Sequence, residues 1–159
     1  MTEDKAIGDI IAEQAREIKD AANRPVRMIS ETGAEAVSRQ TRAGLGRVYE
    51  TALQAGIWPL RYLRHADTLS CAEQLRLARS GVAVIGAGGL GAAVVMLLAR
   101  LGIGRLTVAD PDVFEETNLN RQLPAARDTL GRGKAEAVQA MAADVNPAIA
   151  VRVFSAALG

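Results

Sequence analysis

The stretch from residue 81 to residue 91 reads Gly-Val-Ala-Val-Ile-Gly-Ala-Gly-Gly-Leu-Gly, and it decides the fold. Its β-branched part, residues 82–85, predicts a buried strand. Gly86, Gly88 and Gly91 then form a G-x-G-x-x-G motif, which is informative when it follows a strand and opens a helix. A strand, a glycine turn and a helix in this order are typical of a nucleotide-binding Rossmann unit.

The same stretch raises the alternative of a membrane-spanning helix. Residues 82–99 carry no charge, and a helix of roughly 17 to 18 residues is about the shortest that crosses a bilayer. The four glycines within residues 86–91 argue against that alternative, because each costs about 1 kcal/mol inside a helix. We therefore expect a buried strand, a turn and a buried helix, and no membrane partner.

Strands and helices continue to alternate in the rest of the second half of the chain. Residues 106–109 form the next expected strand, a helix ends at Asn146 and Pro147, and residues 148–154 form a third strand. The helix after the first strand is apolar on both faces, so we expect it to be deeply buried. Its apolar residues at helical spacing are Leu90, Val94, Leu97, Leu98 and Leu101. This order predicts an α/β, Rossmann-like three-layer fold with a parallel β-α-β-α-β core.

The first sixty residues predict a helical N-terminal extension without a chemical site. Four isoleucines at nearly helical spacing indicate a first helix, which Thr2 caps and which ends near Asn23. A second helical stretch is expected over about residues 30–59. The isoleucines are Ile7, Ile10, Ile11 and Ile18. We therefore divide the chain into a helical extension, residues 1–60, and a nucleotide-binding domain, residues 61–159.

A further helix is expected just before the first strand of the nucleotide-binding domain. Ser70 and Glu73 have the S-x-x-E spacing of a capping box, in which two side chains satisfy free backbone donors at a helix start. Leu75 and Leu77 would face inward. The single cysteine, Cys71, lies in this helix, and we expect it to be packed and inert.

Composition and charge exclude several classes of protein. The chain of 159 residues is 49% hydrophobic and 23% charged, close to globular averages, so neither disorder nor a fibrous repeat fits. Lys plus Arg number 19 and Asp plus Glu 18, which gives a net charge of +1 and no broad basic field. A nucleic-acid partner is therefore disfavoured.

One cysteine cannot form an internal disulfide, and the first residues do not resemble a signal peptide, so we expect a cytoplasmic protein.

The glycine motif and the end of the next strand together predict a nucleotide site. Glycines let the backbone approach a phosphate, and free N–H groups at a helix start stabilise negative charge. Asp110 follows about twenty residues after the motif, where a carboxylate can accept hydrogen bonds from ribose hydroxyls. These features do not choose between NAD and ATP. The alternative without a ligand is that the glycines only let the helix pack closely on the strand.

The residues after Asp110 favour a triphosphate. Residues 110–122 and 131–135 add cations and amides beside the glycine motif. A departing pyrophosphate needs its extra charge neutralised, and Arg121 and Lys134 are suited to that task. The alternative is that both are ordinary solvated surface charges.

Five motifs in this order resemble the ThiF/MoeB/HesA family, relatives of the ubiquitin-activating enzymes. The resemblance covers about residues 61–154 and rests on the glycine motif, D-x-D-V, T-N-L-N-R-Q, G-x-x-K-A and N-P. It implies an adenylyltransferase that uses ATP and Mg²⁺ to activate the C-terminal glycine carboxylate of a ubiquitin-like sulfur-carrier protein. It also implies a homodimer. The family's later motifs, among them its metal-binding aspartate, lie beyond residue 159, so we expect an N-terminal portion of such a protein.

The resemblance also implies roles for individual residues. Lys134 and Arg121 would contact the phosphates during transfer, and Asp110 would hold the ribose. Arg64 would reach the ATP of the other subunit, although His65 stands beside it where the family has glutamine. The remaining residues of the implied ATP site are Gly86, Gly88, Gly89, Gly91, Asp112, Thr117, Asn118, Leu119 and Asn120.

Three other functions remain open at this point. An NAD(P)-dependent oxidoreductase uses the same fold. A related branch of the family adenylates or dehydrates a modified tRNA base. The third is a non-catalytic module that binds a nucleotide or dimerises without turnover.

Overall fold

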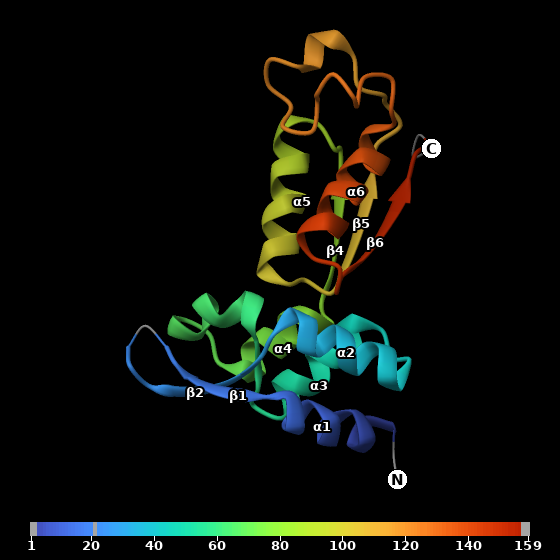
Figure 1. Ribbon diagram of the computed structural model, residues 1–159. Helices are drawn as coiled ribbons and strands as arrows, with labels where there is room; N and C mark the ends of the chain where they lie inside the picture. Colours follow the sequence, from blue (N-terminus) through green and yellow to red (C-terminus); the bar gives the residue numbers. More distant parts are fainter. Residues whose placement is uncertain (1–2, 21, 157–159) are drawn as a thin grey trace. The chain divides into compact units, whose positions relative to one another are not determined.

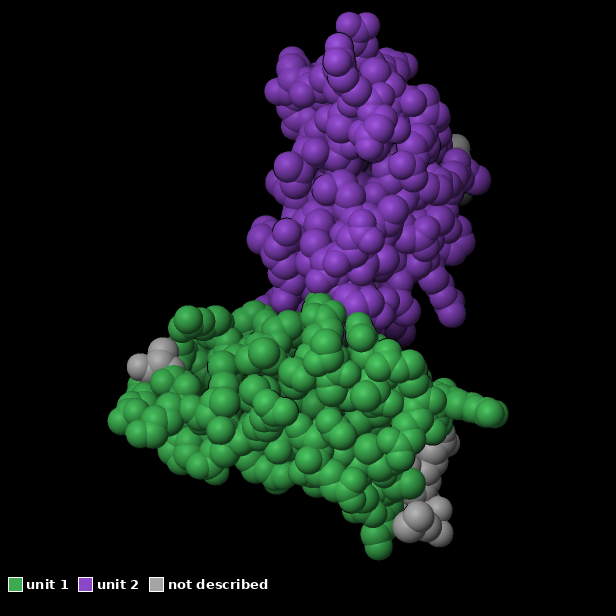
Figure 2. Space-filling view, viewed as in Figure 1, with its two compact units in different colours: residues 1–79 green, residues 80–159 purple. Residues whose placement is uncertain are grey.

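The computed structural model describes residues 3–20 and 22–156. It contains two compact units, residues 1–79 and 80–159, which Figure 2 shows in different colours. The family resemblance begins near residue 61, inside the first unit, so the division at 60/61 into functional domains stays a prediction.

The second unit is a three-stranded parallel sheet with two long helices (Figure 1). Strand β4 (Gly81–Ile85) leads through the glycine turn into helix α5 (Gly89–Leu101), and β5 (Arg105–Ala109) follows. A long connection with the short 3-10 helix η2 (Glu116–Asn118) precedes α6 (Lys134–Val145) and β6 (Ala150–Phe154). The strand order is β4-β5-β6, and both pairs are parallel. The predicted β-α-β-α-β core of a Rossmann-like fold is therefore confirmed.

The two faces of this sheet have different surroundings. Leu106 and Val108 of β5 point to one face and are buried. The other face carries Ile85 and Phe154, which are 68% and 53% exposed and stand on either side of Ala109 in the register. The prediction of a buried first strand is therefore wrong, because alternate residues of β4 are exposed and the others are half-buried. The physical reason is that α5 and α6 cover a single face of the sheet in the described residues.

Helix α5 buries a different side from the one its leucines suggest. Leu90 is 81% exposed and Leu97 is 66% exposed, so the prediction of a deeply buried helix is wrong for this side. The buried side consists of smaller residues and one methionine, namely Ala92, Val95, Met96 and Ala99. The helix starts very close to β4, where a Cβ atom at Gly91 would collide with the Gly86 carbonyl. Small side chains suit such a close approach.

The first unit mixes helices with a small sheet, so the prediction of an all-helical extension is wrong. Helix α1 (Glu3–Gln14) is followed by β1 (Arg16–Lys19) and β2 (Pro25–Ile29), which pair in an antiparallel hairpin. Ile18 therefore lies in a strand, and Thr2 lies outside the described residues. Asn23 adopts a left-handed conformation with φ 62°, which turns the chain between the two strands.

The predicted second helical stretch is two helices and a short strand. Helix α2 (Glu31–Thr41) begins at Ser30, whose hydroxyl accepts a hydrogen bond from the Gly33 N–H at 3.1 Å. Arg42, with φ 58°, ends it, and α3 (Leu45–Gln54) follows. Strand β3 (Trp58–Pro59) then pairs in parallel with β2.

The last two helices of the first unit are the 3-10 helix η1 (Leu60–Asp67) and α4 (Cys71–Arg79). The capping box is confirmed, because Ser70 N–H donates to Glu73 Oε2 at 2.8 Å and Glu73 N–H donates to Ser70 Oγ at 3.2 Å. The fully buried residue of α4 is Gln74, whereas the predicted inward leucines are only half-buried.

None of the described helices has both the length and the apolar character that crossing a bilayer requires.

Candidate functional site

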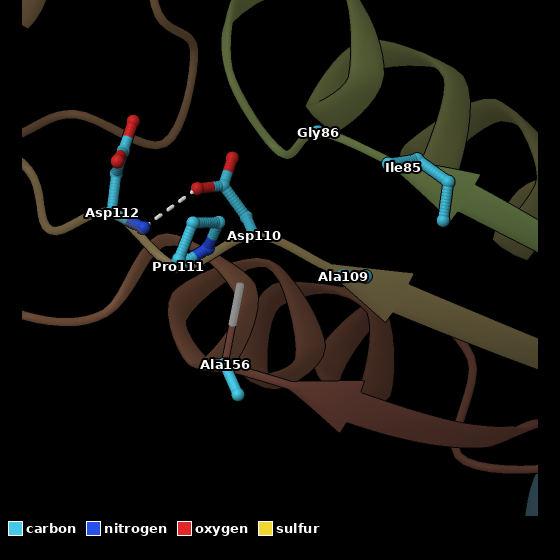
Figure 3. A pocket seen from close by; sticks show the side chains of 7 residues that line it. All are labelled: Ile85, Gly86, Ala109, Asp110, Pro111, Asp112 and Ala156. Atoms are coloured by element: carbon cyan, nitrogen blue, oxygen red, sulfur yellow. Dashed lines mark hydrogen bonds between the residues drawn. The ribbon is translucent and has the colours of Figure 1, made fainter. Parts of the chain in front are cut away.

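The candidate site lies where the strands of the second unit end. Two adjoining cavities of about 330 and 570 Å³ open there, and both are lined by Pro111 and Asp112. Figure 3 shows the smaller cavity, with Asp110 and Asp112 on one side of it. Its lining residues are Ile85, Gly86, Ala109, Asp110, Pro111, Asp112 and Ala156. Ligands of open α/β sheets bind at this edge.

The glycine turn is built by backbone geometry. Gly86 has φ 91°, a conformation that side chains rarely adopt, and its N–H donates to the Ala109 carbonyl at 2.7 Å. A Cβ atom at Gly91 would lie 1.8 Å from the Gly86 carbonyl oxygen, so only glycine fits there. These two glycines hold the start of α5 against the end of β4. Gly88 is the N-cap of α5 and has no side-chain cap, so this helix start can receive an anion.

Asp110 ties the glycine turn to the neighbouring strand. The residue is only 6% exposed. Its Oδ2 accepts a hydrogen bond from the Ala87 N–H at 2.6 Å, and its Oδ1 accepts one from the Asp112 N–H at 2.9 Å. An ionised carboxylate has about four acceptor positions, so both oxygens retain capacity for ribose hydroxyls. Asp110 can therefore shape the cavity and also accept hydrogen bonds from ribose hydroxyls in it.

Lys134 and Asp112 form an ion pair in the larger cavity. Lys134 Nζ donates to Asp112 Oδ2 at 2.9 Å, and the Lys134 N–H donates to the Asp112 carbonyl at the same distance. Lys134 is 8% exposed, which is unusual for a lysine and contradicts the alternative of an ordinary surface charge. The Asp112 side chain is 66% exposed, so the pair has one face open to the cavity.

Arg121 projects from the segment that follows η2. It is exposed, and its Nη1 donates to the Thr117 carbonyl at 2.7 Å and to Asn120 Oδ1 at 3.0 Å. Asn118 is 7% exposed, and its Oδ1 accepts from the Glu115 N–H at 3.1 Å. These contacts order the segment and leave other guanidinium N–H groups of Arg121 available.

The structure brings most of the residues predicted for the site to these two cavities. The larger cavity gathers predicted residues from both sequence segments after β5 and is lined by Pro111, Asp112, Val113, Glu115, Thr117, Asn118, Arg121, Gln122 and Lys134. Leu119 is 40% exposed and lines neither cavity. Asn120 contributes through its contact with Arg121. The roles assigned to these residues stay predictions.

Arg64 belongs to the first unit. It is exposed on η1 and lines a separate cavity of about 450 Å³ together with Lys19, Asp20, Leu60, Leu63 and Asp67. Its predicted role at a partner's ATP stays a prediction.

Cys71 and His65 have structural surroundings in the first unit. Burial raises the pKa of the half-buried Cys71 thiol, which favours its protonated form. His65 Nδ1 lies 2.8 Å from Oε1 of the buried Gln74, and its ring stacks on Tyr62. Both residues therefore fit packing roles.

Sequence reasoning missed the functional interest of Gln122. This residue is 9% exposed and lies beside the start of α5. Its place in the T-N-L-N-R-Q motif was the available signal, but a glutamine in a polar loop gives no indication of burial.

Comparisons with known proteins identify relatives in sequence and in structure. The model of the family described as "ThiF family" matches residues 62–159. The SAMP-activating enzyme E1 of Haloferax volcanii is 43% identical over 98 residues, which are 60% of this chain and 36% of that protein. The tRNA threonylcarbamoyladenosine dehydratase of Bacillus subtilis is 43% identical over 81 residues, or 49% of this chain and 32% of that protein. The crystal structure of the E. coli dehydratase TcdA with ATP matches with a TM-score of 0.60 and 34% identity, over 62% of this chain and 41% of that one. The chain thus spans about a third of the length of these curated relatives.

Proposed function

Because the chain belongs to the ThiF family, we propose that it binds ATP and transfers the adenylyl group to a carboxylate, with release of pyrophosphate. The observation that carries the proposal is the pair of adjoining cavities. One is lined by Gly86 of the glycine turn and by Asp110, and the other is lined by Arg121 and Lys134. The nucleoside would occupy the smaller cavity, and the triphosphate would occupy the larger one.

The proposed chemistry explains why cations stand at the larger cavity. A carboxylate that attacks the α-phosphorus is an anion that approaches another anion, so positive charge must compensate before the two can align. Lys134 Nζ is held by Asp112 and has further N–H donors for a phosphate oxygen. Arg121 provides a second cation from a separate segment. The attacking carboxylate is already ionised, so no general base is needed.

Mg²⁺ is the ion that the resemblance implies, and the described residues do not form a site for it. Within residues 3–20 and 22–156, no three His, Cys, Asp or Glu side chains are grouped so that they could hold a metal. The Asp112 carboxylate, which lines both cavities, is already paired with Lys134. The roles proposed above are therefore those of this chain's own side chains.

We propose a ubiquitin-like sulfur-carrier protein with a C-terminal glycine as the acceptor. The similarity to the SAMP-activating enzyme E1 supports this class. The second candidate is a modified tRNA base, which the similarity to the tRNA dehydratases supports through both sequence and structure. A threonylcarbamoyl group carries a carboxylate too, so the same phosphorus chemistry applies. A cytoplasmic location is part of the proposal for either acceptor.

The first experiment measures ATP binding and ATP–pyrophosphate exchange by this chain. We expect ATP to bind more tightly than NADH in calorimetry, and exchange to depend on an acceptor with a free carboxylate. Exchange with a carrier that ends in glycine supports the first acceptor, and exchange with the modified tRNA supports the second. Tight ATP binding without exchange would favour the non-catalytic module, and preference for NADH would favour an oxidoreductase.

Lys134→Met provides the variant for this experiment, because methionine keeps the buried length of the side chain and removes its charge. We expect about tenfold or greater loss of ATP affinity, since a hydrogen bond to a charged group disappears. Lys5→Met, at an exposed position of α1, is the matched control and should behave as wild type. Equal ATP affinity in both variants would contradict the role of Lys134.

The proposed homodimer has its own test through Arg64. Chains with Arg64→Ala and chains with Lys134→Met should each be inactive in exchange. A mixture of the two should regain activity at about a quarter of its sites, because only mixed dimers combine an intact Arg64 with an intact Lys134. Without recovery, Arg64 does not act across a subunit boundary.

A further inference from the structure

The Gln122 side chain is buried at the larger cavity without a complete set of hydrogen bonds. The residue is 9% exposed, and its Oε1 has no hydrogen-bond partner in the described part of the chain. Gln122 lines the same cavity as Arg121 and Lys134. A buried polar atom without a partner costs free energy, so such an atom at a binding cavity points to a ligand group that completes its contacts.

Gln122 lies against the glycine turn. A Cβ atom placed on Gly88 would lie 3.8 Å from Cδ, Nε2 and Oε1 of Gln122, and one placed on Gly89 would lie 3.2 Å from the Arg121 carbonyl. The carboxamide is therefore beside the uncapped start of α5, where N–H groups favour an anion.

The backbone around Gln122 is held independently of its side chain. The Gln122 N–H donates to the Asn118 carbonyl at 3.0 Å, and the Gln122 carbonyl accepts from the Ala125 N–H at 2.9 Å. Asn118 is fixed in turn by its capping contacts with Glu115. The segment thus holds the carboxamide in place without using its Oε1 in local structure.

The groups around Gln122 determine whether a ligand would contact the NH₂ group or the oxygen of its carboxamide. Rotation about the last side-chain bond exchanges the NH₂ donor and the oxygen acceptor. Arg121 and Lys134 line this cavity, whose two carboxylates are Asp112, paired with Lys134, and Glu115, which accepts a backbone N–H in its capping box. The start of α5 lies beside the carboxamide, so its N–H groups and the cations favour an anion there. A phosphate offers only acceptors, so it would select the NH₂ group.

We propose that Gln122 is a phosphate-binding residue whose NH₂ group donates a hydrogen bond to a phosphate oxygen of the bound nucleoside triphosphate. The inference rests on the proposed ATP binding and adds to it a neutral donor between the cations and the glycine turn. Gln122 therefore discriminates the triphosphate from the unphosphorylated nucleoside.

The test compares the affinities for ATP and for adenosine by calorimetry on the full chain. Gln122→Met removes the donor and Gln122→Glu replaces it with a negative charge. We expect ATP to bind about tenfold more weakly to Gln122→Met, and still more weakly to Gln122→Glu. Adenosine affinity should stay as in wild type for both. Gln122→Asn, with a shorter polar side chain, should also fold and bind ATP more weakly than wild type.

Gln139→Met is the matched control, since Gln139 is half-buried on α6 and its Nε2 donates to the Val151 carbonyl at 2.7 Å. It should lower the melting temperature and leave the ratio of ATP to adenosine affinity unchanged.

Three results would overturn the role of Gln122 while leaving ATP binding intact. Unchanged ATP affinity in Gln122→Met is the first. Unchanged or tighter ATP binding in Gln122→Glu would mean that the oxygen meets a donor. A parallel loss of ATP and adenosine affinity in all three variants would indicate a purely structural residue. Wild-type chain that binds no ATP would instead overturn the proposed function itself.

Discussion

The two ends of the candidate site are built in different ways. At the loop end, Gly86, Gly91 and Asp110 shape the cavity through backbone conformation and backbone hydrogen bonds. At the cation end, Arg121 and Lys134 reach the cavity with long side chains. The loop end is therefore inseparable from the packing of α5 on β4, whereas the cation end can lose a charge while the fold persists. Substitutions at the loop end should therefore change stability and ATP binding together. At the cation end, a substitution should be able to change ATP binding without changing stability.

Gly91→Ala should have the largest effect. The new Cβ atom would lie 1.8 Å from the Gly86 carbonyl oxygen and 2.9 Å from its carbon, and backbone atoms cannot move aside as a flexible side chain can. We expect a loss of about 3 kcal/mol in the free energy of unfolding in urea, together with the loss of ATP binding.

Gly81→Ala is the matched control for this glycine, because its Cβ atom would make ordinary contacts of 3.6 Å and longer with Arg105. We expect it to change stability by no more than about 0.5 kcal/mol. If both variants were equally stable, close packing at Gly91 would not be what holds the loop end.

Asp110→Asn should have an intermediate effect. Its two oxygens accept from the Ala87 and Asp112 N–H groups, and an asparagine would turn a donor toward one of them. We expect a loss of about 2 kcal/mol in the free energy of unfolding, along with weaker ATP binding. Asp144→Asn, at an exposed position of α6, should leave both quantities unchanged. If Asp110→Asn bound ATP weakly but kept wild-type stability, Asp110 would contribute to ligand binding and not to the stability of the fold.

Arg121→Ala should have the smallest effect on stability. Its side chain is exposed and bonds only within its own segment in the contacts described, so the free energy of unfolding should change by no more than about 0.5 kcal/mol. ATP affinity should nevertheless fall about tenfold. The loss should shrink at high salt, which screens an exposed charge. Arg127→Ala, also exposed, is the control, and an equal effect of both variants would remove the special role of Arg121.

Sequence reasoning predicted the second unit far better than the first. In the second unit a glycine motif, strand-forming runs and a helix-ending Asn146-Pro147 pair are all local signals, and the structure follows them. In the first unit, residues 16–29 form a hairpin although Ile18 fits a helical pattern. Four residues of a short strand carry too little periodicity to be distinguished from a helix. The pairing of β1 with β2, and of β2 with β3, decided that region.

The candidate site divides in the same way. The T-N-L-N-R-Q and G-x-x-K-A motifs pointed to Arg121 and Lys134, because cations beside a glycine motif have a direct chemical meaning. The burial of Lys134 against Asp112 could not be predicted, nor could the Gln122 oxygen that has no partner among the described residues. These features depend on contacts between segments far apart in the chain.

The sequence by itself determined the order of strands and helices in the second unit, the glycine turn and the family. The elements and the turn rest on neighbouring residues, whose backbone preferences act over a few positions, and the family rests on the order of short motifs along the chain. Only the tertiary structure decided which side of α5 is buried, which face of the sheet is open and which polar groups face the cavities. An apolar pattern shows which positions avoid water, but α5 is apolar all round. The close approach at Gly91 selected its small residues for the sheet and left Leu90 and Leu97 exposed.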